Sequence, residues 1–211
     1  MILFILRLFC YQSLGHKANI RAKILNYYKE SKKLFRYLCK TEMEKDRPVI
    51  YLFTDGAASG NPGPGGYGVV MKCAVEGPDG QKRLAVKEMS GGFRRTTNNR
   101  MELLAVITGL EAIRWENAEV EVWSDSSYVV KAISEGWLEN WKRTGFKKKK
   151  NMDLWLRFDA VNKLHRVRFH WLKGHAGHPE NERCDALAVA AYHAPDLPED
   201  TGYTEEEQTL I

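Results

Sequence analysis

Short apolar runs that favour β-strands occupy the first part of the sequence beyond residue 43. Residues 49–54 form the first β-rich run, and residues 66–73 and 84–91 form two more. The second and third runs are joined at residues 77–80 by Gly-Pro-Asp-Gly, which favours a tight reversal of the chain. The pattern therefore predicts three strands that follow one another in antiparallel order.

Helical periodicity and strand-like runs alternate in the second part. Residues 97–114 open with the cap-forming Thr97, Asn98 and Asn99, after which apolar residues recur at three- and four-residue steps. The other expected elements are a strand at 120–124, helices at 126–135 and 151–164, a strand at 167–172 and a helix at 179–193. This order predicts an α/β fold in which helices pack on a mixed sheet.

Charge is distributed unevenly along the chain. The 211 residues include 32 Lys and Arg and 27 Asp and Glu. Residues 1–42 contain nine of the basic and two of the acidic residues, which leaves 23 basic and 25 acidic residues in the remainder. We therefore expect one compact domain at residues 43–195 that is not uniformly basic. A basic extension at 1–42 precedes it, and an acidic tail at 196–211, expected to be solvated and poorly ordered, follows.

Two interpretations of the basic extension stay open. Residues 18–40 place apolar residues at helical steps among many lysines, which is typical of an amphipathic helix that contacts nucleic acid or an anionic membrane surface. Alternatively, Met43 is the true start and residues 1–42 are translated upstream sequence, which we favour because charge and pattern change there. The apolar residues 1–10 fall short of the roughly 20 that span a bilayer, so we expect no membrane partner.

The cysteines point to a reducing compartment. Four cysteines are scattered along the chain with no paired spacing, at Cys10, Cys39, Cys73 and Cys184. This arrangement predicts neither a disulfide framework nor a zinc site. We expect a cytoplasmic protein that is a monomer.

Four acidic residues occupy positions that suit chemistry. Asp55 and Asp125 each end an apolar strand, and functional groups gather at the carboxyl ends of strands in open α/β sheets. Glu102 lies one turn into the helix that begins at Thr97, and Asp185 has a similar apolar setting near the start of the last helix. Any one of these acids taken alone is an ordinary cap or surface charge. The prediction of a shared site depends on the set.

Four clustered carboxylates repel one another unless cations are present. An all-oxygen set favours Mg²⁺, with Mn²⁺ as the alternative, over zinc, which prefers His and Cys. Two such ions roughly 3.5–4 Å apart can activate a water and stabilise the leaving oxygen of a phosphoryl transfer. We therefore predict a two-metal site made by Asp55, Glu102, Asp125 and Asp185.

Four sequence blocks carry a family pattern. They read TDGAASGNPGPGG at 54–66, RTTNNRMEL at 95–103, SDS at 124–126 and KGHAGHPENERCD at 173–185. Together they resemble bacterial type I ribonuclease H in order and nearly in spacing, over about residues 48–203. The resemblance implies a five-stranded mixed sheet flanked by helices. It also implies metal-dependent hydrolysis of the RNA strand of RNA–DNA hybrids, which leaves 5′-phosphate and 3′-hydroxyl ends.

The resemblance assigns roles to individual residues. It places the metal ligands on the same four acids, and it gives His175, in a loop rich in glycine, a part in proton movement or product release. Asn61 and Asn98 would approach the RNA strand, together with backbone amides of the glycine-rich loop at 60–66.

Further implied contacts concern the DNA strand. A phosphate of that strand would be held by Arg95, Thr97 and Asn151. Residues 136–150 resemble the basic protrusion of the family, in which Trp137, Trp141 and Lys142 would contact the hybrid. The alternative for this segment is a solvated charged loop with its aromatic side chains in the core.

Two rival functions share parts of this pattern. A non-catalytic hybrid-binding module would keep the binding groove and lose an acid, and all four acids are present here. A polynucleotidyl transferase shares the fold and the metals, but such proteins lack the loop block around His175 and the basic protrusion. Both readings stay as alternatives to hydrolysis of hybrids.

Overall fold

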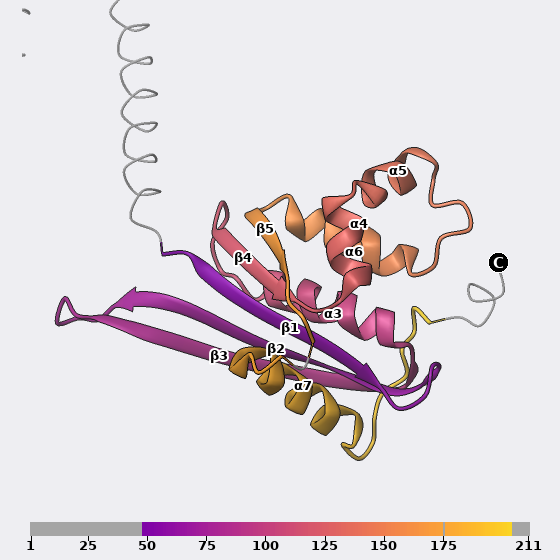
Figure 1. Ribbon diagram of the computed structural model, residues 1–211, viewed down its shortest axis with the longest axis horizontal. Coiled ribbons are helices and arrows are strands. Elements are labelled where there is room, and N and C mark those ends of the chain that lie inside the picture. Colours follow the sequence, from indigo (N-terminus) through magenta and orange to yellow (C-terminus); the bar gives the residue numbers. More distant parts are fainter. Residues whose placement is uncertain (1–47, 175, 204–211) are drawn as a thin grey trace, which may run out of the picture. The chain divides into compact units, whose positions relative to one another are not determined.

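A five-stranded sheet forms the centre of the part of the chain that the computed structural model describes, residues 48–174 and 176–203. Its strands are β1 (Ile50–Ala58), β2 (Gly63–Glu76), β3 (Lys82–Thr96), β4 (Glu119–Ser124) and β5 (Arg166–Trp171). They lie in the order β3-β2-β1-β4-β5 (Figure 1). Neighbours among β1, β2 and β3 are antiparallel, whereas β4 is parallel to β1 and to β5. The predicted mixed sheet is therefore confirmed.

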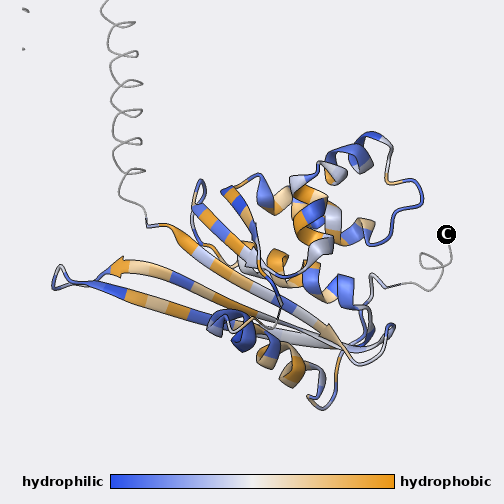
Figure 2. Cartoon of the chain, viewed as in Figure 1, coloured by the Kyte–Doolittle hydropathy of each residue, from blue (hydrophilic) through white to orange (hydrophobic). Residues whose placement is uncertain are grey.

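Helices cover both faces of this sheet (Figure 1). On one side α3 (Asn98–Glu111) and α4 (Ser127–Ser134) contact the strands, while α6 (Met152–Asn162) packs on α3 and α5 (Trp137–Arg143) packs on α4. The other face carries α7 (Pro179–Tyr192). Along β4 and β5 hydrophobic and hydrophilic residues alternate, as expected of strands whose two faces differ in exposure (Figure 2). The main core lies between the sheet and α3, where Leu52, Val122, Leu103 and Ile107 are fully buried.

The basic segment at 136–150 contains a helix, α5, that the periodicity did not predict. Seven residues are too few to show a helical repeat, and the helix begins after Gly136 in the left-handed conformation. Leu138 and Trp141 of this helix are buried in the core. The burial of Trp141 matches the alternative in which aromatic side chains of this segment pack inward.

The expectation of a solvated, poorly ordered acidic tail is wrong for residues 196–203. The side chain of Asp200 is buried and pairs with the buried Arg100 of α3. A carboxylate and a guanidinium stabilise each other strongly where water is excluded, and composition alone does not reveal such a partner. Residues 204–211 of the tail, the extension at 1–42 and His175 lie outside the described residues.

Glycines of β2 allow α7 to lie directly on the sheet. A Cβ atom at Gly68 would overlap the carbonyl oxygen of Cys184, and one at Gly66 would overlap that of Ala188. Backbone therefore meets backbone along this contact, and no side chain fits between them. The contact fixes α7, and with it Asp185, against the strand that borders β1.

We predict that Gly68→Ala destabilises the protein by about 2–3 kcal/mol, because the added methyl group must displace a whole helix from the sheet. Urea unfolding followed by circular dichroism measures the change. Ala74→Val adds bulk to an exposed position of the same strand and serves as the matched control, with little expected effect. Equal stability of Gly68→Ala and the wild type would mean that α7 does not pack on β2 as described.

Candidate active site

Two aspartates lie side by side where the parallel pairing of β1 with β4 ends. The last paired residues of that ladder are Thr54 and Ser124, so Asp55 and Asp125 come next on neighbouring strands. The prediction that the strand ends at Asp55 is wrong, because β1 continues to Ala58 through its pairing with β2. The expected placement of the two carboxylates at the end of the parallel strands nevertheless holds.

Glu102 reaches these aspartates because α3 approaches β1 closely at Gly56. A Cβ atom at residue 56 would overlap the backbone nitrogen of Glu102 and lie 2.5 Å from the carbonyl carbon of Met101. Carboxylate oxygens of Asp55, Glu102 and Asp125 all lie within 4.8 Å of one another. Since Asp55 is 8% and Glu102 7% exposed, the cluster is largely removed from water.

Like charges held away from water make these carboxyl groups hard to ionise. Burial, followed by the charge of Asp125, raises the pKa of Asp55 to about 7, although a 2.7 Å hydrogen bond from the Gly56 amide to Asp55 Oδ1 opposes the shift. Burial, followed by the charges of Asp55 and Asp125, raises the pKa of Glu102 well above its ordinary value. The Oε2 atom of Glu102 is buried with no hydrogen-bond partner among the described residues. No cation of the described residues is among the charges that shift these two pKa values.

Asp185 stands at the margin of the cluster. It is half-buried on α7, and its negative charge contributes, after burial and the charge of Asp125, to the raised pKa of Asp55. Its oxygens do not belong to the group that lies within 4.8 Å. The structure thus brings three of the four predicted ligands together and places the fourth within electrostatic reach of Asp55.

Two residues that the sequence analysis missed hold Asp125 in place. Asn181 of α7 is 4% exposed, and its Nδ2 donates a 3.2 Å hydrogen bond to Asp125 Oδ2. Trp171 of β5 donates from Nε1 to the backbone oxygen of Asp125, also at 3.2 Å. Asn181 stands four residues before Asp185 on the same helix, a spacing that places both on one face. The four-residue spacing between Asn181 and Asp185 could therefore have indicated that Asn181 belongs to the site.

A chain of amides connects the loop after β1 to the carboxylates. The backbone nitrogen of Asn98 donates to Asn61 Oδ1 at 3.1 Å, and Asn98 Nδ2 donates to Glu102 Oε1 at 3.3 Å. Both asparagines were predicted to approach the RNA strand. Asn98 therefore lies beside Glu102, and Asn61 is joined to it through the backbone of Asn98.

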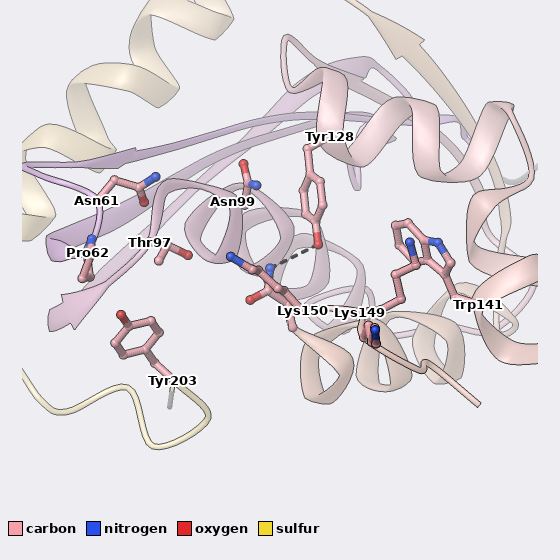
Figure 3. A pocket seen from close by; sticks show the side chains of 11 residues that line it. Asn61, Pro62, Thr97, Asn99, Tyr128, Trp141, Lys149, Lys150 and Tyr203 are labelled. Carbon is pink, nitrogen blue, oxygen red and sulfur yellow. Dashed lines mark hydrogen bonds between the residues drawn. The ribbon is translucent and has the colours of Figure 1, made fainter. Parts of the chain in front are cut away.

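A cavity of about 510 Å³ is lined by Asn61 from the loop after β1, by Thr97 and by Tyr128 (Figure 3). It contains four of the residues expected to bind substrate, namely Asn61, Thr97, Trp141 and Asn151. Three consecutive lysines, Lys148 to Lys150, share its wall, and Asp and Glu are absent from its described lining. Asn151 is held by a 3.1 Å hydrogen bond from its Nδ2 to the hydroxyl of Tyr128. The cavity is therefore suited to an anion.

Asn98 and three further expected substrate contacts do not line this cavity. Arg95 is exposed near the end of β3. Trp137 is half-buried and packs near Trp141, with ring centroids 6.2 Å apart. Lys142 is engaged by two acids, because its Nζ lies 2.8 Å from both Glu139 Oε1 and Asp159 Oδ1.

The sequence model of the RNase H family matches residues 47–193, which include all four acids and every residue that lines the cavity except Tyr203. The chain belongs to the ribonuclease H family. The predicted resemblance is thereby confirmed.

Several bacterial proteins named ribonuclease H are similar to this chain over nearly their whole length. The ribonuclease H of Desulforamulus reducens is 54% identical over 165 residues, which are 76% of this chain and 98% of that protein. The ribonuclease H of Nitratidesulfovibrio vulgaris is 50% identical and covers 74% of this chain and 97% of its own. The Escherichia coli K12 protein of the same name is 51% identical, with the same two coverages.

Solved ribonuclease H structures agree on the fold. LC9-RNase H1, a type 1 RNase H with the type 2 active-site motif, superposes with a TM-score of 0.62 at 32% identity, over 70% of this chain and 73% of that one. The N-terminal RNase H domain of rv2228c from Mycobacterium tuberculosis gives a TM-score of 0.52 at 28% identity, over 69% and 94% of the two chains.

As for membranes, none of the helices in the described ranges is both long and apolar enough to cross a bilayer.

We predict that the metal-free protein loses stability as the pH rises from about 4 to about 7. In that range the folded state retains a proton on Asp55, whose pKa is about 7 against 3.8 for an ordinary aspartate, while the unfolded state has lost it. Because the folded state binds the extra proton, its free energy of unfolding falls as the pH rises. The expected loss is roughly 4 kcal/mol, at about 1.4 kcal/mol per pKa unit. Asp55→Asn removes this penalty and should be more stable than the wild type at about pH 8.

Urea unfolding in EDTA across this pH range tests the prediction. Glu76→Gln, which neutralises an exposed acid at the end of β2, is the matched control and should follow the wild-type curve. If the Asp55→Asn and wild-type curves run parallel from about pH 4 to about pH 8, Asp55 does not titrate abnormally, and the charge repulsion described above is wrong.

Proposed function

We propose that this chain hydrolyses the RNA strand of RNA–DNA hybrids, using divalent cations held by Asp55, Glu102, Asp125 and Asp185. The observation that carries the proposal is the buried carboxylate cluster with oxygens within 4.8 Å of one another. Its position within the segment matched by the RNase H family supports the same reading. The products would carry 5′-phosphate and 3′-hydroxyl ends.

The residues present fit Mg²⁺, with Mn²⁺ as the alternative. The donors are all carboxylate oxygens, the ligand type that these hard cations prefer. The Oε2 atom of Glu102 is buried without a hydrogen-bond partner in the part of the chain that the structure describes, and the pKa of Asp55 is raised. A bound cation would stabilise both carboxylates in their charged form. When bound, two such ions would activate a water molecule and stabilise the leaving oxygen.

The protein's own part in the reaction is to hold charge and position. Asp55 and Glu102 are kept in place by the close packing of β1 on α3. Asn181 fixes the direction of Asp125 through its hydrogen bond to Oδ2. We assign His175, by resemblance, to proton movement or product release.

Binding of the hybrid is divided between two surfaces. The amide chain of Asn61 and Asn98 beside Glu102 offers polar groups to the strand that is cut. The cavity with Thr97, Asn151 and the lysines would take a backbone phosphate of the other strand. At the margin of this surface we still propose contacts of the hybrid with Arg95, Trp137 and Lys142.

We also propose a cytoplasmic monomer built on the domain at 43–195. The two cysteines in the described ranges, Cys73 and Cys184, are free and buried, which suits a reducing compartment. Burial raises the pKa of the Cys184 thiol to about 12, so it stays protonated and unreactive.

Asp55→Asn should abolish metal-dependent cleavage of a labelled hybrid and leave binding of the hybrid intact, because the change removes a metal-binding charge and keeps the shape of the side chain. Gel analysis of cleavage and fluorescence anisotropy of binding measure the two effects separately. Glu76→Gln is the control and should cut at the wild-type rate. Persistent cleavage by purified Asp55→Asn would refute the assignment, as would full wild-type activity in EDTA.

A further inference from the structure

The C-terminal segment, residues 196–203, is fastened to the domain by a buried ion cluster. Arg100 is 1% exposed, and its Nε and Nη2 donate to the carboxylate of Asp200 at 2.7 and 2.9 Å. The same guanidinium donates to both oxygens of Asp153 at 2.9 and 2.7 Å. Thr96 Oγ1 adds a 2.7 Å hydrogen bond to Asp200 Oδ2. Leaving a buried charge without its partner is costly, so the cluster keeps the segment in place.

Tyr203 is positioned by a turn that starts at this cluster. Its backbone nitrogen donates to the carbonyl oxygen of Asp200 at 2.9 Å. The intervening Gly202 lies flat on the ion pairs, since a Cβ atom there would overlap Asp153 Oδ2 and lie 2.5 Å from Arg100 Nη2. Tyr203 stands only three residues after Asp200, so the ion cluster fixes where its backbone lies.

This turn places Tyr203 in the wall of the lysine-lined cavity. Figure 3 shows its hydroxyl directed toward the side of the cavity formed by Pro62 and Thr97. Lys148 to Lys150 belong to the same lining. The only charged groups in the described lining are lysines, and amides and hydroxyls stand there beside Pro62 and Trp141. Such a wall attracts a phosphate rather than a cation.

We propose that Tyr203 is a nucleic-acid-binding residue, whose hydroxyl donates a hydrogen bond to a backbone phosphate of the bound hybrid. Arg100 and Asp200 act through it as positioning residues. A tyrosine hydroxyl is one of the neutral groups that commonly contact phosphate. Because the turn already fixes its backbone, Tyr203 loses little freedom on binding. The inference rests on the proposed function and adds a residue to its binding surface.

Tyr203→Phe tests the contact and keeps the aromatic ring in the wall. We expect the KM for a short RNA–DNA hybrid to rise about tenfold, the loss that one hydrogen bond to a charged group carries, while kcat is unchanged. Tyr51→Phe removes an exposed hydroxyl from β1, outside the cavity, and is the matched control that should behave as the wild type. A wild-type KM for Tyr203→Phe overturns the proposal.

Hybrids that carry a single neutral methylphosphonate linkage, scanned along each strand, locate the contact. At one linkage, in either strand, the substitution should weaken binding by the wild type about tenfold and binding by Tyr203→Phe far less, because phosphate and hydroxyl form one interacting pair. If the two penalties add at every linkage, the hydroxyl does not contact a phosphate and the proposal is wrong.

Gly202→Val tests the positioning by the ion cluster. The added side chain must lift the turn from Asp153 and Arg100, so the variant should show the KM rise of Tyr203→Phe, with no further rise when the two changes are combined. Additive effects would contradict the positioning role. If Gly202→Val fails to fold, Tyr203→Phe and the linkage scan decide the proposal without it.

Equilibrium binding separates this inference from the proposed function. The Kd of a fluorescein-labelled hybrid is measured in the Asp55→Asn background, with and without Tyr203→Phe, so that no cleavage is needed. Failure of the wild type to cut hybrids would refute the proposed function while the Kd comparison still tests Tyr203. Equal Kd values for Asp55→Asn with and without Tyr203→Phe would refute the role of Tyr203, even if the wild type cuts hybrids.

Discussion

Repulsion between buried carboxylates is the constraint on which the rest of the site depends. Asp55, Glu102 and Asp125 hold their oxygens within 4.8 Å of one another, and two of the three side chains are almost completely removed from water. Without positive charge, such a group is relieved only by taking up protons, as the raised pKa values of Asp55 and Glu102 indicate. The fold keeps the group together although it opposes folding, which is the behaviour of a binding site for cations.

Close backbone packing is the means by which the fold holds this cluster. Gly56 lets α3 approach β1 until Glu102 lies beside Asp55, and Gly68 lets α7 approach β2 until Asn181 reaches Asp125. Each contact involves the backbone of a regular element, so the backbone positions that carry the carboxylates cannot move apart unless a helix leaves the sheet. The strain of like charges is therefore carried by the packing of helices on the sheet.

Much of this arrangement followed from local patterns in the sequence. Apolar strands ending near Asp55 and Asp125 placed both at one end of a parallel pair, and the four family blocks predicted the sheet and the ligand set. The missed features depend on contacts between distant residues. Arg100 and Asp200 are a hundred positions apart, and neither position has a pattern that names its partner. Helix α5 was missed because its seven residues give too short a repeat.

The substrate contacts show the same division. Of the residues chosen by resemblance, Asn61, Thr97, Trp141 and Asn151 line the cavity, and their contacts with substrate stay predictions. Lys142 was chosen for its charge, yet its charge is taken up by Glu139 and Asp159, one of them on another helix. Charge along a sequence predicts that a segment is basic, whereas the pairing of each side chain is decided only when the elements pack.

Proton release on metal binding tests the central claim most directly. Mn²⁺ is titrated calorimetrically into the full-length protein at about pH 6.5, in two buffers of different ionisation enthalpy. If the buried carboxylates hold protons until a cation replaces them, the observed heat will depend on the buffer and will report protons released. Binding heats that are identical in both buffers would contradict the account, because they would mean that the cluster is already ionised before the metal arrives.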